Sequence, residues 1–585
     1  MLPVVNTEQE FAEHDRALIA ELRDHAEQQR SGYNIPTQTM LSPAEIAAVM
    51  CEHYSPAQLR TLEQTLAERG TFDIPLTSGL IDVDGRQQHI PFVAATSTEA
   101  SHGDMSSMLY LRDHIQTARS YIEISRHDPN RYCEEGQSGR QLLTSALDLI
   151  STPKQLERFE RVMAIGAEAG QEDWPHISLL FHDLMAENPN GWRNMQDSFQ
   201  MLAHLALDAL EYGELAVADL RDNHKHFLSS LVPFLSAVGY PDYLNSGTWE
   251  EFAASRTSVM AVETAVLHKI HRLLTGDQAE QYAFLRGGYR GSAHGFTQAL
   301  DALMQRGLEE VGSRLPYETP WDDPSGSIYR EADAALTYVL MYNLPALLAE
   351  ARVPIGPEQD IMTTEEIEQL VLDTLSRLDD PVTGGMKRYI DDSYQRTNFH
   401  THTTQTAIAS IKRRISAQAA ISGQPPDLIA KQNLRDQAVE PGRAAAWTHP
   451  LGQLSAWAAR RSLEASHGGN TLASQHYRRL SSTYLNRQLH LITGDGQYQA
   501  VLRADGSYAV QPVPAFKLPE CYITYHDAAG EFMVASPHTP LNWSTATLRE
   551  ALGMLLIATD QATVQQLGHT SLKVAPRDSR QTPAA

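Results

Sequence analysis

Apolar residues recur at spacings of three and four from about residue 140 to about residue 490. This is the period of an amphipathic helix, so each such run predicts a helix with one face directed at a core. Clusters of Gly, Pro and Asn separate the runs and predict the connecting loops. The predicted helical runs are 141–150, 154–168, 196–212, 223–238, 256–274, 294–310, 330–350, 364–378, 402–420, 447–466 and 472–490.

No sequence repeat of fixed length accompanies this pattern, which argues against a solenoid. So many helices in one block are typical of an all-α protein. They fit a closed toroid of helical hairpins, although the number of helices alone does not establish closure.

The N-terminal part of the chain has a different character. Residues 1–70 contain three helical patterns, the last of which begins at Pro56 and ends before Gly70. We expect 1–70 to form a helical N-terminal extension that covers the main domain or mediates self-association. Residues 71–98 then carry short extended patterns around a turn-like Asp-Val-Asp-Gly sequence, followed by a helix that ends near Ile124.

Beyond residue 486 the helical pattern stops. Alternating runs at 489–493, 499–503 and 508–513, joined by Asp-Gly turns, predict short β-hairpins. Helix is expected again over 546–558, within a main domain that spans 71–573. The tail 574–585 is rich in Pro, Arg, Ser and Gln and is expected to be disordered.

Composition excludes several classes of protein. The apolar fraction of 42% is ample for a large core, and the net charge of −25 argues against nucleic acid or an anionic membrane as partner. The three cysteines are far apart in the sequence, so we expect neither a disulfide framework nor a cysteine zinc site. With no signal peptide and no long apolar segment evident, we expect a cytoplasmic protein that needs no cofactor.

Four clusters place carboxylates or arginines beside aromatic residues, at the ends of predicted elements. An aromatic ring provides a stacking surface for a sugar, and it raises the pKa of a neighbouring carboxylic acid by desolvation. Each cluster alone is also explained as a helix start, a turn or a solvated charged loop. The clusters are Tyr110–Asp113, Asn245–Phe252, Gly384–Tyr394, and Leu518–Glu520 with Ser536–Ser544.

This combination resembles glycoside hydrolase family 15, the glucoamylase-like enzymes, and more distantly the related domain of the phosphorylase kinase regulatory subunits. The resemblance spans roughly residues 90–560, with the motifs in the order of the family. It implies an (α/α)6 barrel, a toroid of six helical hairpins, with short β-hairpins in its loops.

The resemblance also implies roles for individual residues. Glu250 matches the general acid that protonates the glycosidic oxygen, and Glu520 matches the general base that activates water. Glu251 and the pocket tryptophans are expected to contact sugar, and Gly247 replaces an aspartate common in the family. The substrate-binding residues implied in this way are Tyr110, Arg112, Asp113, Trp249, Glu251, Arg388, Asp392 and Trp543, with a looser match for Arg193 and Asp197.

An inverting hydrolase keeps its two carboxyl groups roughly 6.5–9.5 Å apart, which leaves room for the attacking water. Residues as distant in sequence as Glu250 and Glu520 meet this requirement only across a folded pocket. The acid must be protonated and the base ionised, so their surroundings must differ.

Other motifs are weaker. His400 and His402 have a spacing that suits a metal ion, but no third ligand is evident, so we expect no metal site. Ser101–Asp104 is better explained by turns and caps than by a nucleophile. The glycine-rich stretch 286–291 lacks the lysine and serine of a phosphate-binding loop.

Two hypotheses remain. The first is an exo-acting, inverting α-glucosidase that releases glucose from short α-glucans or α-glucosyl disaccharides. The second is a non-catalytic carbohydrate-binding or regulatory protein on the same barrel. Neither involves nucleic acid or a membrane, and self-association stays open.

Overall fold

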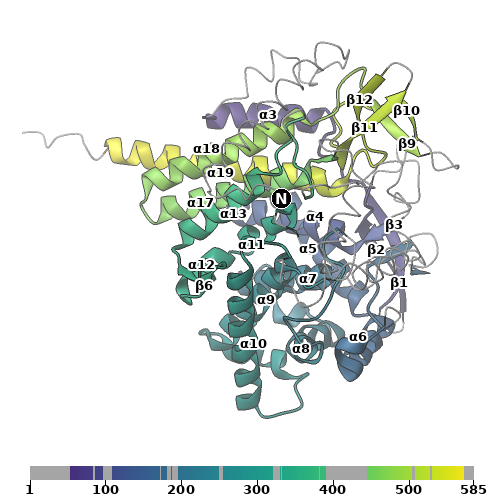
Figure 1. Ribbon diagram of the computed structural model, residues 1–585, viewed down its shortest axis with the longest axis vertical. Helices are drawn as coiled ribbons and strands as arrows, with labels where there is room; N and C mark the ends of the chain where they lie inside the picture. The colour runs from purple at the N-terminus through teal and green to yellow at the C-terminus, as the bar shows by residue number, and fades with distance from the viewer. Residues whose placement is uncertain are drawn as a thin grey trace, which may run out of the picture.

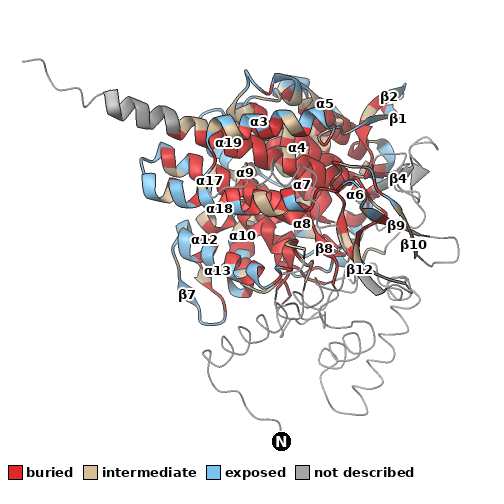
Figure 2. Cartoon of the chain, turned by 90° about the horizontal axis from the view of Figure 1, so that it is seen from above, coloured by how far each residue is buried: buried red, intermediate tan, exposed pale blue. Residues whose placement is uncertain are grey.

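The computed structural model is built mainly from helices, with most of the labelled strands on the right of the view and β6 on the left (Figure 1). Buried residues fill the middle of the helical assembly, and exposed residues lie at its rim (Figure 2). The structure describes residues 53–83, 86–96, 108–170, 173–180, 186–187, 196–249, 254–319, 330, 332–380, 383–389, 444–502, 508–527 and 530–571.

Six helical positions form a closed inner ring within this described part. Each helix contacts the next one along the chain, and the last contacts the first. This closure confirms the predicted (α/α)6 barrel on contacts within the chain itself. The ring consists of α4 (Leu111–His127), α7 (Gln196–Glu211), α9 (Thr257–Thr275), α11 (Thr337–Met341), α17 (His449–His467) and α19 (Asn542–Ser571).

An outer layer of helices packs around the ring. These helices are amphipathic, whereas the inner helices are buried on nearly all sides, because only the inner helices have neighbours on every face. The outer helices are α5 (Cys133–Ile150), α6 (Pro153–Ile165), α8 (Asp222–Ala237), α10 (Ala293–Arg314), α12 (Leu344–Glu350), α13 (Thr364–Ser376) and α18 (Thr471–His490).

The helix α3 (Pro56–Glu68) falls within the predicted N-terminal extension. Ser55 caps it through a capping box with Gln58, and its buried stripe of Leu59, Leu62 and Leu66 packs against α19. This helix therefore occupies the outer position beside α19 and shares the core of the barrel. The division of the chain at residue 70 stays a prediction.

The run 330–350, predicted as one helix, is broken in the structure. A 3₁₀ turn (η5, Ala334–Leu336) leads into α11, which ends at Met341, and α12 begins after Asn343. Asn343 has a left-handed backbone with φ of 57°, which an α-helix cannot contain. Pro345 then fits the first turn of α12, where its missing N–H is no loss.

Small sheets lie around the barrel, and their strands pair in antiparallel fashion except for the parallel pair of β9 and β12. The hairpin of β1 (Leu76–Val83) and β2 (Arg86–Val93) confirms the extended pattern expected there. A five-stranded sheet has the order β10-β9-β12-β11-β8, and a three-stranded sheet joins β3, β4 and β5. The other strands are β3 (Met108–Tyr110), β4 (Ser178–Leu180), β5 (Ala186–Glu187), β6 (Pro354–Ile355), β7 (Asp360–Ile361), β8 (Ala446–Trp447), β9 (Tyr498–Leu502), β10 (Tyr508–Pro512), β11 (Cys521–Asp527) and β12 (Gly530–Ala535).

The predicted extended run 489–493 is wrong. Helix α18 continues to His490, with Leu485 and Leu489 both buried in the core. The spacing of four residues between Leu485 and Leu489 places both on one face of the helix. The alternation of residues within 489–493, which suggested a strand, does not correspond to a strand in the structure. The predicted helix 402–420 and the predicted tail 574–585 lie outside the described residues.

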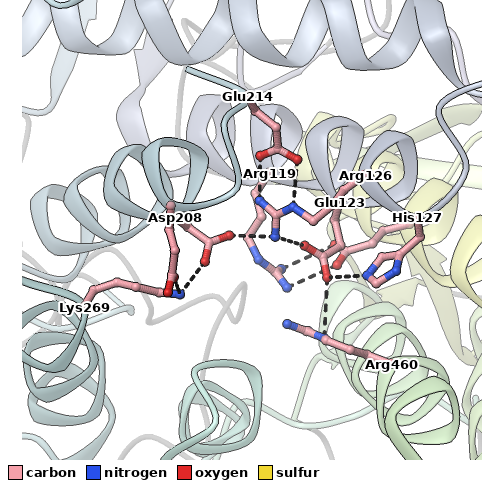
Figure 3. A network of polar contacts seen from close by, with 10 residues as sticks. Arg119, Glu123, Arg126, His127, Asp208, Glu214, Lys269 and Arg460 are labelled. Carbon is pink, nitrogen blue, oxygen red and sulfur yellow. Dashed lines mark hydrogen bonds and ion pairs between the residues drawn. The ribbon is translucent and has the colours of Figure 1, made fainter. Parts of the chain in front are cut away.

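The C-terminal ends of the inner helices are joined by a buried ion network (Figure 3). Arg126 of α4 lies 2.7 Å from both Asp208 of α7 and Glu214. Lys269 of α9 contacts Asp208 at 2.7 Å, and Arg460 of α17 lies 3.7 Å from Glu123 of α4. The network therefore ties four inner helices together at the same end of the ring.

The carboxylate of Asp208 links two other helices in this network, because it contacts Arg126 of α4 and Lys269 of α9. Burial alone raises its pKa, but Arg126 and Lys269 together outweigh burial, so the pKa is lowered. We expect Asp208→Asn to lower the free energy of unfolding by about 3–5 kcal/mol, since it leaves buried cations without their partner. Urea unfolding of the purified variant measures this loss.

The matched control is Glu157→Gln, which breaks the exposed Arg161–Glu157 pair of α6 and is expected to cost less than about 1 kcal/mol. Because the folded-state pKa of Asp208 is lowered, its contribution is present above the unfolded value of about 3.9 and is lost as pH falls through the folded value. The stability difference between wild type and variant should therefore shrink in acid. A difference that is equally small for both variants at neutral pH contradicts the role assigned to Asp208.

Candidate active site

Side chains from several sequence motifs meet at the N-terminal ends of the inner helices. Arg112 and Asp197 are the second residues of α4 and α7, and Trp543 is the second residue of α19. His449 opens α17, and Trp249 lies shortly before α9. The N-terminus of a helix presents free backbone N–H groups and a positive dipole end, so this end of the ring favours polar or negatively charged ligands.

Arg112 and Asp197 form a buried ion pair. The Nε of Arg112 donates to Asp197 Oδ2 at 2.9 Å, and its Nη2 donates to Oδ1 at 3.4 Å. Arg112 Nη1 also donates to the carbonyl oxygen of Thr248 at 2.7 Å. The pair thus joins the α4 motif to the segment before α9, and it fixes the direction of the guanidinium.

A cluster of aromatic rings lies beside this pair. The ring of His449 stacks on Trp543 with centroids 3.9 Å apart, and Trp249 packs against Trp447 at 5.3 Å. The guanidinium of Arg112 lies 6.0 Å from the centroid of the Trp543 ring. Such flat apolar faces beside fixed charges suit a ligand with an apolar face and polar edges, as a sugar ring has.

Arg388 reaches the same cluster from another motif. Its guanidinium lies 5.5 Å from the Trp249 ring centroid and 5.3 Å from that of Trp447. Its backbone is held by a hydrogen bond from the Ala334 N–H to its carbonyl oxygen at 2.6 Å. Two arginines, Arg112 and Arg388, therefore flank the tryptophans.

The backbone of Glu520 is fixed next to this cluster. Its N–H donates to the carbonyl of His538 at 3.0 Å, and its carbonyl accepts from the Thr448 N–H at 3.3 Å. Thr448 precedes His449, and its hydroxyl donates to Ser544 Oγ at 2.8 Å. Pairing of β11 with β8 therefore brings a buried carboxyl group, Glu520, to the N-terminal end of α17.

The remaining predicted residues divide into two groups. Tyr110 pairs with Ser178 in the small sheet and precedes α4, and Asp113 is buried in the first turn of that helix. The other four lie outside the described residues: Arg193, Glu250, Glu251 and Asp392.

Several residues of the cluster are absent from the sequence-based prediction. Asp333 accepts the indole N–H of Trp249 at 2.6 Å, and Trp447 and His449 complete the aromatic cluster. Asp333 had one local signal, an acidic residue before an apolar helical run, which is typical of an N-cap. The partners of Trp447 and His449 come from other parts of the chain, so local sequence carries no sign of their role.

Two buried polar atoms of this cluster are unsatisfied. His449 Nδ1 and Trp543 Nε1 have no hydrogen-bond partner among the described residues. Burial, and then the charge of Arg112, lower the pKa of His449 well below its ordinary value, so the imidazole is neutral. Polar atoms buried without partners cost free energy, and a binding site is one place where that cost is tolerated.

Neither a metal site nor a membrane span emerges from the described coordinates. Across the described ranges, no three His, Cys, Asp or Glu side chains are grouped so as to hold a metal ion. The pair His400 and His402 lies outside those ranges. Likewise, no described helix combines the length and apolar character needed to cross a membrane.

Comparison with known proteins adds the following. No protein-family model matches the chain, and no curated protein matches it significantly. Among solved structures, the chain is similar to a wild-type glycosidase (15% identity, 90% of this chain and 99% of the other, TM-score 0.40). It is also similar to the glucoamylases of Hormoconis resinae (11%, 85% and 73%, TM-score 0.44) and Saccharomycopsis fibuligera (12%, 86% and 96%, TM-score 0.45).

Position 247 has no room for the aspartate that is common there in the family that the sequence resembles. The φ of Gly247 is +65°, and a Cβ atom there would lie 2.3 Å from Cδ of the buried Arg256. The side chain of Arg256 thus fills the space that a residue at 247 would need. The glycine is required both by its backbone conformation and by this contact.

We expect Gly247→Ala to lower the free energy of unfolding more than Gly239→Ala does. Gly239 also has positive φ, +77°, but no atom lies within 4 Å of its would-be Cβ. Gly239→Ala should therefore show only the backbone strain of about 1–2 kcal/mol. Gly247→Ala should lose about 1–3 kcal/mol more through overpacking against Arg256.

Urea unfolding of both variants tests this expectation. In an Arg256→Ala background, Gly247→Ala should cost no more than Gly239→Ala does, because the space at 247 is then open. Equal losses at the two glycines would show that the contact with Arg256 has no energetic weight.

Proposed function

We propose that this protein is an exo-acting glycoside hydrolase of glucoamylase type, which inverts configuration at the anomeric carbon. The observation that carries this proposal is the convergence of Arg112, Trp249, Arg388, Trp543 and the backbone of Glu520 at one end of the helical ring. These residues come from motifs spread over the whole barrel. A surface ion pair or a simple helix cap would not require them to meet.

The proposed substrate is an α-linked glucoside, either a short α-glucan or a disaccharide. Arg112 and Arg388 would donate hydrogen bonds to sugar hydroxyls, and their forked donors fix the orientation of the terminal glucose. The tryptophans would pack on the apolar face of the ring. The unsatisfied N–H of Trp543 and the neutral imidazole of His449 offer further partners for hydroxyl groups.

In the proposed reaction Glu250 protonates the glycosidic oxygen, and the bond from that oxygen to the anomeric carbon breaks. Glu520 takes a proton from a water molecule, whose oxygen attacks the anomeric carbon from the opposite face. Trp249 directly precedes Glu250 in the sequence and is buried, and an apolar ring beside the acid would raise its pKa by desolvation. The products are β-glucose and the glucan shortened by one residue, or the free second sugar when the substrate is a disaccharide.

We expect Glu250→Gln and Glu520→Gln each to lower kcat for maltooligosaccharides by a factor of about 10²–10⁴, since each removes one proton transfer. Glucose release from the purified variants measures this loss. The exposed Glu157→Gln is the matched control and should keep wild-type activity. Full activity in either site variant refutes the assignment.

The stereochemistry is tested separately. Proton NMR of the first-formed sugar should show β-glucose before mutarotation, because attack by water inverts an α-linkage. Initial α-glucose refutes the inverting mechanism. Calorimetry with the same glucans completes the test, since binding without turnover would support the non-catalytic hypothesis instead.

A further inference from the structure

The carboxylate of Asp333 is fully buried and accepts three hydrogen bonds. Its Oδ1 accepts from Trp249 Nε1 at 2.6 Å and from the backbone N–H of Ala335 at 2.8 Å. Its Oδ2 accepts from Arg330 Nη1 at 3.1 Å. A carboxylate held from three directions has a fixed position, so the indole bonded to it is also fixed.

The backbone around Asp333 is tied to a second part of the site. Asp333 pairs with Tyr389 in an antiparallel bridge, and the Ala334 N–H donates to the carbonyl of Arg388 at 2.6 Å. The guanidinium of Arg330 stacks over the Tyr389 ring at 3.6 Å. One short segment therefore holds Trp249 through a side chain and Arg388 through the main chain.

A second buried carboxyl group, that of Glu318, lies within electrostatic reach of Asp333. Glu318 accepts from the Ser258 N–H at 2.9 Å and from Ser258 Oγ at 2.6 Å, in the first turn of α9. Burial, and then the charge of Asp333, raise the pKa of Glu318 to about 8. Glu318 therefore links the first turn of α9 to the buried surroundings of Asp333.

The segment that contains the proposed acid is fixed at its base as well. The backbone groups of Asn245 and Ala254 exchange two hydrogen bonds of 2.9 Å, so residues 245 and 254 are held side by side. Between them, Trp249 is anchored by its bond to Asp333. The residue that follows Trp249 in the sequence is Glu250.

From this geometry we infer that Asp333 is a positioning residue: its hydrogen bond fixes the Trp249 indole, whose neighbour in the sequence is the proposed acid, and in this way it supports proton transfer to the leaving group. The inference rests on the proposed function and goes beyond it, because it assigns a role to a residue outside the four motifs. A displacement of a catalytic group by about 1 Å can cost on the order of 100-fold in rate.

Two substrates separate a positioning role from a structural one. Maltose has a poor leaving group that must be protonated, whereas α-glucosyl fluoride releases fluoride without help from an acid. We expect Asp333→Ala to lower kcat on maltose by about 100-fold and to affect α-glucosyl fluoride at least about tenfold less. Trp249→Phe, which keeps the aromatic ring but removes the N–H donor, should show the same selectivity.

Two further variants serve as controls. Asp333→Asn keeps an oxygen that accepts from Trp249 and Ala335, so it should recover most of the maltose activity. Asp148→Ala removes a buried aspartate that pairs with His224 at 2.7 Å between α5 and α8, far along the chain from these motifs. It should lose stability comparably but keep the wild-type ratio of the two activities.

The outcomes are distinguishable. If wild-type protein cleaves both substrates but Asp333→Ala and Trp249→Phe lose both activities equally, or lose neither, the inference is overturned while the proposed function stands. If Asp333→Ala does not fold, Trp249→Phe decides the matter alone. If the wild type cleaves neither substrate, the proposed function itself fails, and the role of Asp333 fails with it.

Discussion

The structure depends on the parallel alignment of its inner helices. Contacts at one end join the starts of helices, as between Arg112 of α4 and Asp197 of α7, and contacts at the other end join their later turns, as between Arg126 and Asp208. Parallel helices add their dipoles, which makes one end of the ring positive and the other negative. Cations near the C-terminal end, and the proposed sugar-binding groups at the N-terminal end, both fit this alignment.

The two ends of the ring carry out different tasks. At the C-terminal end, buried acidic and basic side chains pair with one another across four helices. At the N-terminal end, charges are paired but some polar atoms stay unsatisfied, as at Trp543 and His449. The ion network at the C-terminal end holds the helices in place. Because the same helices carry the side chains of the proposed site at their N-terminal ends, the network also helps to fix the positions of those side chains.

Much of the fold follows from the sequence alone, because helical periodicity is a local property. Most described helices begin and end within a few residues of the predicted runs; α5 begins earlier and α19 ends later than predicted, and Asn343 breaks the run 330–350. In the site, Arg112, Trp249, Arg388 and Trp543 were identified through motifs and do meet. Asp333 and His449 were not, because their importance lies in partners distant in sequence.

Gly247 and Arg256 also constrain how this protein can change over generations. A residue larger than glycine does not fit at 247 while Arg256 is in place, whereas the glycine sets no limit on the side chain at 256. Replacing Arg256 by a smaller residue first would open the space. Replacing Gly247 by a larger residue first would produce a clash with Arg256. Such coupling is epistasis between neighbours. It makes one order of substitution accessible to selection and the reverse order costly, so the two positions are expected to change together among descendants of this sequence.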